Sequence, residues 1–155
     1  MYYASVKVRV DSFVKDELLR DGRAGADYLF SLSSKTLWVS DEIDSIPILI
    51  GNDPTDIESL FQTIELFKRR GKPFYAAAGL DPIHYGLTDS IVRYHALRQR
   101  CADIEIMLGI GNFSELTHAD TLGVKAILLG SASELGVHGF LTTEVSGKWP
   151  LPERS

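Results

Sequence analysis

Three polar side chains in this sequence each stand at the end of an apolar, β-branched run, and their chemistry fits one kind of ligand. They are the carboxylates of Asp11 and Asp81 and the amide of Asn112. A carboxylate accepts two N–H bonds from a guanidine-like edge, and an amide both donates and accepts. Together these groups can ring a heterocycle that carries an amino group beside a ring N–H. They predict an N–H-rich ligand rather than a phosphate or a nucleic acid.

Further positions at or beside the ends of such runs are possible lining residues of the same site. Glycines leave room for a ligand close to the backbone, and polar side chains can bond to it. These positions are Ser31, Ser33, Asn52, His84, Gly109, Gly111, Phe113 and Glu144. The alternative for any single aspartate is that it caps the helix that follows. The recurrence of such residues at several run ends favours the binding role.

No other motif predicts a competing chemistry. The segment Gly109–Glu115 has Ser114 where a dinucleotide-binding fingerprint needs its third glycine. The chain has four histidines, and none stands at metal-ligand spacing from another histidine or from the single cysteine, Cys101. The sequence therefore predicts no protein metal site and no internal disulfide.

The elements that position these groups alternate between strand and helix patterns. Each apolar run gives way to a helix signal, which is typical of βα units whose strand ends gather at one face of a parallel sheet. Residues 36–39 fit either a short strand or an irregular edge segment. The six runs are Val6–Asp11, Tyr28–Ser33, Ile46–Asn52, Phe74–Asp81, Ile104–Asn112 and Phe140–Glu144. The helices are expected at 13–24, 55–71, 87–101 and 118–135.

Local signals mark where helices begin and end. Thr55 with Glu58 fits a capping box, in which two side chains bond to the first backbone N–H groups of a helix. Gly25, Gly71 and Gly136 each follow a helical stripe of apolar residues. A glycine there can take the left-handed conformation that closes a helix, so these three positions are expected to be helix ends.

Composition bounds the class of protein. The chain has 155 residues, of which 45% are hydrophobic and 24% charged, so one folded domain is expected. Its net charge is -5, with no stripe of Lys and Arg, which excludes a nucleic-acid footprint. No apolar run reaches the ~20 residues of a membrane span. A cytoplasmic setting is expected, with residues 1–146 as the domain and 147–155 as an irregular tail.

A family resemblance is carried by Asp81–Ile83, Met107–Thr117 and Leu128–Val145. These segments are similar to the dihydropteroate synthase-like proteins of the pterin-binding family. The similarity lies with the branch found in methanogens and methylotrophs that is associated with tetrahydromethanopterin synthesis. A looser similarity over residues 8–28 extends the resemblance to nearly all of 5–145.

The resemblance implies part of a TIM barrel. It aligns the six predicted strands with the third to eighth strands of the family, so the first two βα units are missing. Two parallel strand edges would then need a cover, either from the missing units or from a second copy in a homo-oligomer. The alternative is an open parallel α/β sheet that never closes into a barrel.

The resemblance also assigns roles to residues. Asp11 and Asp81 match aspartates that contact the pterin ring, and Asn112 matches a pterin-contacting Asn of related methyltransferases. In true synthases an Arg-Lys pair, whose Lys assists pterin binding, stands where this chain has Asn112-Phe113. An Arg and a His that help to hold the diphosphate stand near the positions of Thr143 and Glu144. The cations that hold a diphosphate are therefore absent from these positions. Mg²⁺ is a possible substitute for them.

The resemblance implies a reaction with two substrates. A reduced pterin, as its diphosphate, would be condensed with an arylamine in folate or methanopterin biosynthesis, with no covalently bound cofactor. One alternative is a methyl-pterin-binding methyltransferase domain, which the absent cations favour. Another is a non-catalytic binding or assembly module, which the missing barrel units favour. All three hypotheses exclude nucleic acid and membrane as partners.

Overall fold

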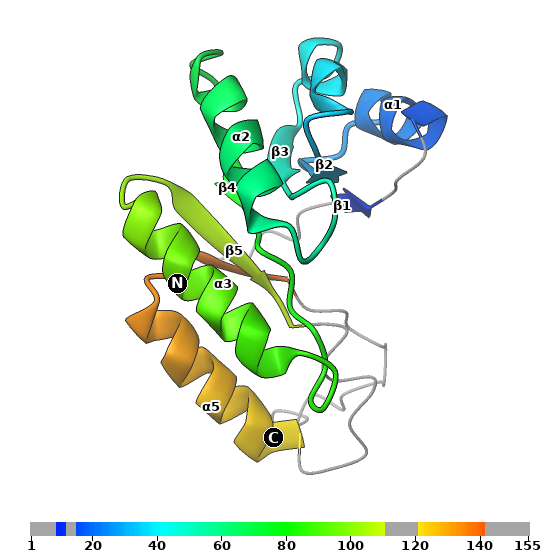
Figure 1. The fold of residues 1–155 in the computed structure, drawn as a ribbon. Helices are drawn as coiled ribbons and strands as arrows, with labels where there is room; N and C mark the ends of the chain where they lie inside the picture. Colours follow the sequence, from blue (N-terminus) through cyan, green and yellow to red (C-terminus); the bar gives the residue numbers. More distant parts are fainter. Residues whose placement is uncertain (1–8, 12–14, 111–120, 142–155) are drawn as a thin grey trace, which may run out of the picture.

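The computed structural model describes residues 9–11, 15–110 and 121–141, and the predicted tail lies outside these ranges. Strands and helices alternate along the chain, with one 3-10 helix, η1, after the second strand (Figure 1). The strands are β1 Arg9–Asp11, β2 Tyr28–Leu32, β3 Ile46–Leu49, β4 Tyr75–Ala76, β5 Glu105–Gly109 and β6 Gly139–Leu141. The helices are α1 Lys15–Arg23, η1 Leu37–Asp41, α2 Ile57–Lys68, α3 Leu87–Arg100 and α5 Thr121–Glu134.

The described strands form one all-parallel sheet whose order follows the chain, from β1 to β6. Doubly wound sheets reverse their strand order partway across, and this sheet does not. The prediction of an α/β fold with a parallel sheet is confirmed. The sheet is an open half-barrel with β1 and β6 at its edges, as the open-sheet alternative predicts.

The helices pack on one face of this sheet. Leu49 and Ile106 point to that face and join side chains of α1, α2, α3 and α5 in the larger buried cluster. Neighbouring strand residues point to opposite faces. Ile48 and Met107 accordingly belong to a second, smaller cluster with side chains of β2, β4 and β6. The two clusters fix which face of every strand is turned to the helices.

Helix α2 is held by the deepest apolar stripe. Leu60, Ile64 and Phe67 follow the i, i+4, i+7 spacing of a buried face, and none is more than 1% exposed. Phe67 also meets Phe74 edge-on, with ring centroids 5.5 Å apart. Each such side chain contributes about 1.5–3 kcal/mol on burial. The stripe therefore anchors α2 along its length, from Leu60 in the first turn to Phe67 in the last.

Helix ends were predicted better than strand lengths. Gly25, Gly71 and Gly136 have φ of 92°, 65° and 63°, so all three take the predicted left-handed conformation. Strand β4 pairs only over Tyr75–Ala76, which is shorter than the apolar run around it. Residues 36–39 are neither strand nor irregular edge, because successive i to i+3 bonds wind them into η1.

The predicted capping box at Thr55 is wrong by one residue. Asp56 is the N-cap of α2, and its carboxylate accepts a bond from the backbone N–H of Ser59. Thr55 instead donates its own N–H and hydroxyl to Asp53. Aspartate and threonine both serve as caps, and the turn that precedes the helix decides between them.

Candidate functional site

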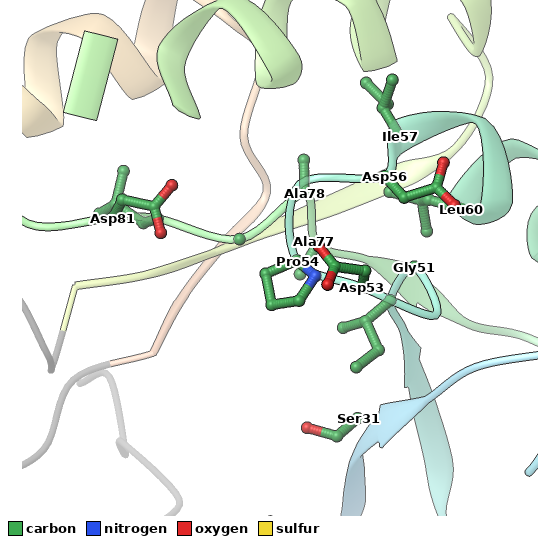
Figure 2. A pocket seen from close by; sticks show the side chains of 13 residues that line it. Ser31, Gly51, Asp53, Pro54, Asp56, Ile57, Leu60, Ala77, Ala78 and Asp81 are labelled. Atoms are coloured by element: carbon green, nitrogen blue, oxygen red, sulfur yellow. The ribbon is translucent and has the colours of Figure 1, made fainter. Parts of the chain in front are cut away.

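A cavity of about 280 Å³ lies where β2, β3 and β4 end, at the carboxyl edge of the sheet (Figure 2). In parallel α/β proteins this edge is where ligands bind. Strand β2, the start of α2 and two loops, β3–α2 and β4–α3, contribute to this strand-end cavity, and the residues on its β4 side are mostly small. Its lining consists of Ser31, Ile50, Gly51, Asp53, Pro54, Asp56, Ile57, Leu60, Ala77, Ala78, Gly79, Leu80 and Asp81.

Strand β2 reaches the cavity through an irregularity in its pairing. The register with β3 shifts between Leu29 and Leu32, and Ser31 within that stretch has φ of 65°. A non-glycine residue in the left-handed region costs about 1–2 kcal/mol, and such strain is concentrated at functional sites. A bulge re-aims a side chain. Here it brings Ser31 into the cavity lining.

The β3–α2 loop supplies two carboxylates. Asp53 accepts bonds from the Thr55 hydroxyl at 2.6 Å and the Thr55 N–H at 2.9 Å, and these bonds lower the pKa of Asp53 below its ordinary value. Asp56 caps α2 through one oxygen, at 3.1 Å from the Ser59 nitrogen. Gly51 makes this turn possible, because a Cβ there would lie 2.6 Å from the Asp56 carbonyl oxygen.

The β4–α3 loop supplies the third carboxylate, Asp81. Its Oδ2 accepts bonds from Arg93 at 2.7 Å and from the Ser90 hydroxyl at 3.0 Å. The backbone N–H of Asp81 donates to the same hydroxyl at 2.8 Å. No described residue bonds to Oδ1, and Asp81 lines the cavity (Figure 2). The carboxylate is thus fixed through one oxygen, and the other accepts no bond from the described residues.

The polar side chains of the strand-end cavity are mainly hydrogen-bond acceptors. Three carboxylates line it, and no lysine or arginine is among its described lining residues. Carboxylates accept N–H bonds, and a ligand rich in N–H donors would satisfy them. The carboxylates and small residues of the described lining are suited to binding and orienting a ligand.

The structure places some of the predicted site residues in this cavity and others elsewhere. Ser31 and Asp81 line it. Asn52 is exposed and accepts a bond from the Ser34 hydroxyl. His84 is exposed with φ of 70°, and neither it nor Ser33 is in the lining. Ser33 belongs to a turn, in which its N–H donates to the Thr36 hydroxyl and its own hydroxyl accepts a bond from the N–H of Lys35.

Two other predicted residues are placed only by their backbone positions. Asp11 ends β1 in register with Phe30, and Gly109 ends β5 in register with Leu141. Both therefore lie at the same edge of the sheet as the cavity. The other predicted site residues lie outside the described ranges: Gly111, Asn112, Phe113 and Glu144.

Sequence reasoning missed three charged residues of the site, Asp53, Asp56 and Arg93. The segment Asp53-Pro54-Thr55 was interpreted only as a turn, so Asp53 and Asp56 were not among the predicted residues. Arg93 was missed because it lies within a helix. One signal was available, because the buried positions of α3 follow helical spacing and Arg93 stands on that stripe beside Tyr94. A charged residue on an apolar stripe needs a buried partner.

A second cavity, of about 350 Å³, lies at the opposite edge of the sheet, where β3, β4 and β5 begin. Lys68 and Asp103, two of its lining residues, form an ion pair at 3.1 Å. Residues at this edge of a βα barrel serve stability rather than catalysis. The strand-end cavity is smaller, but it lies at the carboxyl edge of the sheet and contains the Asp81 oxygen that no described residue binds, so it is the better candidate for a ligand site.

Tyr75 in this second cavity gives a measurable titration. Its bond to Glu105 on the adjacent strand, and then burial, raise the pKa of Tyr75 to about 12. The raised pKa means that the phenol stabilises the fold below pH ~10 and that this contribution is lost as the pH rises towards ~12. Glu105→Gln is expected to lower the pKa of one tyrosine, measured by phenolate absorbance. An unchanged titration curve would show that the bond to Glu105 is not the cause.

Other reactive groups in the described part of the chain give no second site. Cys101 is 5% exposed, and burial raises the pKa of its thiol, which disfavours a reactive thiolate. Within residues 9–11, 15–110 and 121–141, no three His, Cys, Asp or Glu side chains are grouped to hold a metal ion. In the same ranges, every helix falls short of the length and apolar character needed to cross a membrane.

Comparison with known proteins gives one relative of unassigned activity. This chain is 26% identical over 159 residues to an uncharacterized protein of Methanocaldococcus jannaschii. The match covers 91% of this chain and 30% of the relative, so the chain spans less than a third of that protein. No family model matches the sequence.

Proposed function

We propose that this chain is the pterin-binding domain of a dihydropteroate synthase-like enzyme, built as the later part of a TIM barrel. The observation that carries the proposal is the Asp81 carboxylate. It lies in the β4–α3 loop, is fixed through Oδ2 and has an Oδ1 to which no described residue bonds. An oxygen held in place in this way can accept an N–H bond from an amino group or a ring nitrogen of the ligand.

The rest of the cavity fits a flat heterocycle. Ala77, Ala78 and Gly79 form a floor of small residues against which a ring can lie. Ile57 and Leu60 provide an apolar wall on the α2 side. A volume of about 280 Å³ is at the lower end of the range for small-molecule sites, so it accommodates a single small ligand. We assign it to the pterin ring.

The proposed reaction forms a C–N bond between the pterin and an arylamine. The amine nitrogen attacks the methylene carbon of the pterin diphosphate, the C–O bond breaks, diphosphate leaves and the amine loses a proton. An arylamine is already a free base at neutral pH, so catalysis rests on orientation and on stabilising the departing anion. The described lining contributes the first of these, and Mg²⁺ carried by the diphosphate would contribute the second.

A second candidate is methyl transfer from a methylated pterin to a corrinoid partner. The acidic lining favours it, because three carboxylates and no described cation oppose the binding of a diphosphate. The two candidates differ in a simple titration. The synthase requires that hydroxymethyl-dihydropterin diphosphate bind more tightly with Mg²⁺ than without it. The methyltransferase requires a methylated reduced pterin to bind, with no gain from a diphosphate.

The open edges of the half-barrel support a further part of the proposal. Strands β1 and β6 each have one neighbour among the described strands. Uncovered parallel edges invite pairing with other chains. We therefore propose that further barrel units or a second copy of the chain cover them. Pairing of these edges with a second copy is also what the third hypothesis, a non-catalytic binding or assembly module, requires.

The test of pterin binding is calorimetric titration with dihydropterin and with dihydrolumazine. Dihydrolumazine carries a carbonyl oxygen in place of the amino group, so it presents an acceptor to the carboxylates. Dihydropterin is expected to bind in the micromolar range and dihydrolumazine at least about tenfold more weakly, because one charge-assisted bond is lost. Asp81→Asn should weaken dihydropterin by a similar factor, since it removes the acceptor oxygen but keeps the shape.

Asp103→Asn is the matched control for this titration. Asp103 is an exposed aspartate near the opposite edge of the sheet, so its loss changes net charge by the same amount without touching the strand-end cavity. Its dihydropterin affinity should equal that of the unaltered protein. Equal affinities for dihydropterin and dihydrolumazine, or no binding by a folded protein, would contradict the proposed pterin site.

A further inference from the structure

Arg93 is a buried arginine that donates to the loop carrying Asp81 and, on its own helix, to the Ser90 hydroxyl at 3.0 Å. It is 8% exposed, and its guanidinium reaches three parts of the β4–α3 loop. Nε donates to the Ala78 carbonyl at 3.0 Å. Nη2 lies 2.7 Å from Asp81 Oδ2 and 3.4 Å from the Gly79 carbonyl oxygen. The shortest of these contacts is the charge-assisted one to the carboxylate.

The planar guanidinium links two surfaces of the strand-end cavity. The carbonyls of Ala78 and Gly79 belong to its floor, and Asp81 belongs to its wall. Because the donors of one guanidinium are fixed relative to one another, floor and wall are held at a set spacing. Arg93 itself is not a lining residue, so it acts on a ligand only through these groups.

Gly86 leaves room for the Asp81 carboxylate to lie close to the backbone. A Cβ at Gly86 would lie 3.1 Å from Asp81 Oδ2, and Gly86 has φ of 120°, which other residues rarely adopt. Arg93 and Ser90 occupy the same oxygen through hydrogen bonds. The carboxylate therefore has little freedom to rotate, because Oδ2 is held by Arg93 and Ser90. The position of Oδ1 is fixed with it.

Arg98, one turn further along α3, shows what an arginine with a purely structural role looks like here. Its guanidinium donates to carbonyl oxygens near the ends of α3 and α5 and the start of β5, and no bond to a carboxylate is among its described contacts. These acceptors are the carbonyls of Cys101, Ala102, Ile104, Leu135 and Gly136. None of them belongs to the strand-end cavity.

We infer that Arg93 is the positioning residue of the ligand site, holding Asp81 and the cavity floor in the geometry that receives the N–H edge of the ligand. The inference rests on the proposed function, because its readout is the affinity for a pterin. Arginine is required for this role because lysine, a point charge, can satisfy Asp81 or the Ala78 carbonyl but cannot hold both in one plane.

The test compares Arg93→Lys with Arg98→Lys by calorimetric titration with dihydropterin. Arg93→Lys is expected to weaken binding by about tenfold, because a misplaced charge-assisted acceptor loses most of its bond. Arg98→Lys removes a guanidinium that also makes several hydrogen bonds and lies on the same helix, and it should leave the affinity for dihydropterin within about twofold of the unaltered protein. When Asp81→Asn is already present, adding Arg93→Lys should weaken dihydropterin binding by less than about a further twofold, because the effect of Arg93 on the ligand is transmitted by the Asp81 carboxylate.

The outcomes distinguish a failure of the positioning role of Arg93 from a failure of the proposed pterin binding. If the unaltered protein does not bind dihydropterin, the proposed function fails. If it binds and folded Arg93→Lys binds equally well, or if both lysine variants weaken binding alike, the positioning role fails. Arg93→Gln, which keeps a planar N–H donor, replaces the lysine variant if circular dichroism shows that variant unfolded. If neither variant folds, Arg93 serves folding alone and the inference is overturned.

Discussion

Phe67→Ala is expected to lower the free energy of unfolding by about 3–5 kcal/mol, which is a large part of the total stability of a domain of this size. Phe67 is fully buried, on the face of α2 that packs against the sheet. Its ring meets Phe74 edge-on at 5.5 Å and lies 5.7 Å from the Arg70 guanidinium carbon. Removal of the ring leaves a cavity that none of these partners can fill without shifting the helix.

Urea denaturation followed by circular dichroism measures this loss. Leu66→Ala is the matched control, because Leu66 is the preceding residue of the same helix and is 45% exposed. Its effect should stay within about 0.5 kcal/mol. A loss below about 1 kcal/mol for Phe67→Ala would show that α2 is not packed as described, since a buried phenylalanine in a rigid core costs more than that.

Gly51→Ala is expected to disrupt the strand-end cavity and the fold together. An added Cβ would lie 2.6 Å from the Asp56 carbonyl oxygen and 2.8 Å from that of Asp53. Backbone oxygens cannot move aside as a flexible side chain does, so the β3–α2 loop must open. We expect a loss of about 1–3 kcal/mol in stability, the usual cost of overpacking. We also expect dihydropterin affinity to fall by about tenfold or more, because the loop carries Asp53 and Asp56.

Gly130→Ala provides the control for this substitution. Gly130 lies within α5, and a Cβ there would meet nothing within 4 Å. Alanine at an exposed helical position should raise stability by up to about 1 kcal/mol and leave ligand binding unchanged. If Gly51→Ala is as stable as the unaltered protein, the tight turn after β3 is not required. If it is destabilised but binds dihydropterin normally, the loop does not contribute to the site.

The two substitutions separate stability from binding in a useful way. Phe67 lies in the last turn of α2 and is not a lining residue of the cavity, so its loss should lower stability while the folded molecules still bind. Gly51 lies in the cavity lining, so its loss should affect both properties. Affinity measured well below the unfolding midpoint of each variant therefore reports the local geometry of the cavity and not the fraction of folded protein.

The sequence by itself determined the fold class and most element positions. Side-chain periodicity and glycine placement are local properties, and they predicted the alternation of strands and helices and the left-handed ends at Gly25, Gly71 and Gly136. They failed where local signals compete. Thr55 and Asp56 can both cap a helix, and only the bond from Ser59 to Asp56 shows which one does so.

The tertiary structure decided which strand-end residues share a cavity. The sequence placed Asp81 and Ser31 among many polar residues at strand ends, and it did not separate them from Asn52 or His84. That separation depends on the bulge at Ser31 and on loops that approach one another across the sheet. The contact between Arg93 and Asp81 joins residues 12 positions apart through the start of a helix. No local pattern encodes such a contact, because its energy depends on burial that exists only after α3 has packed on the sheet.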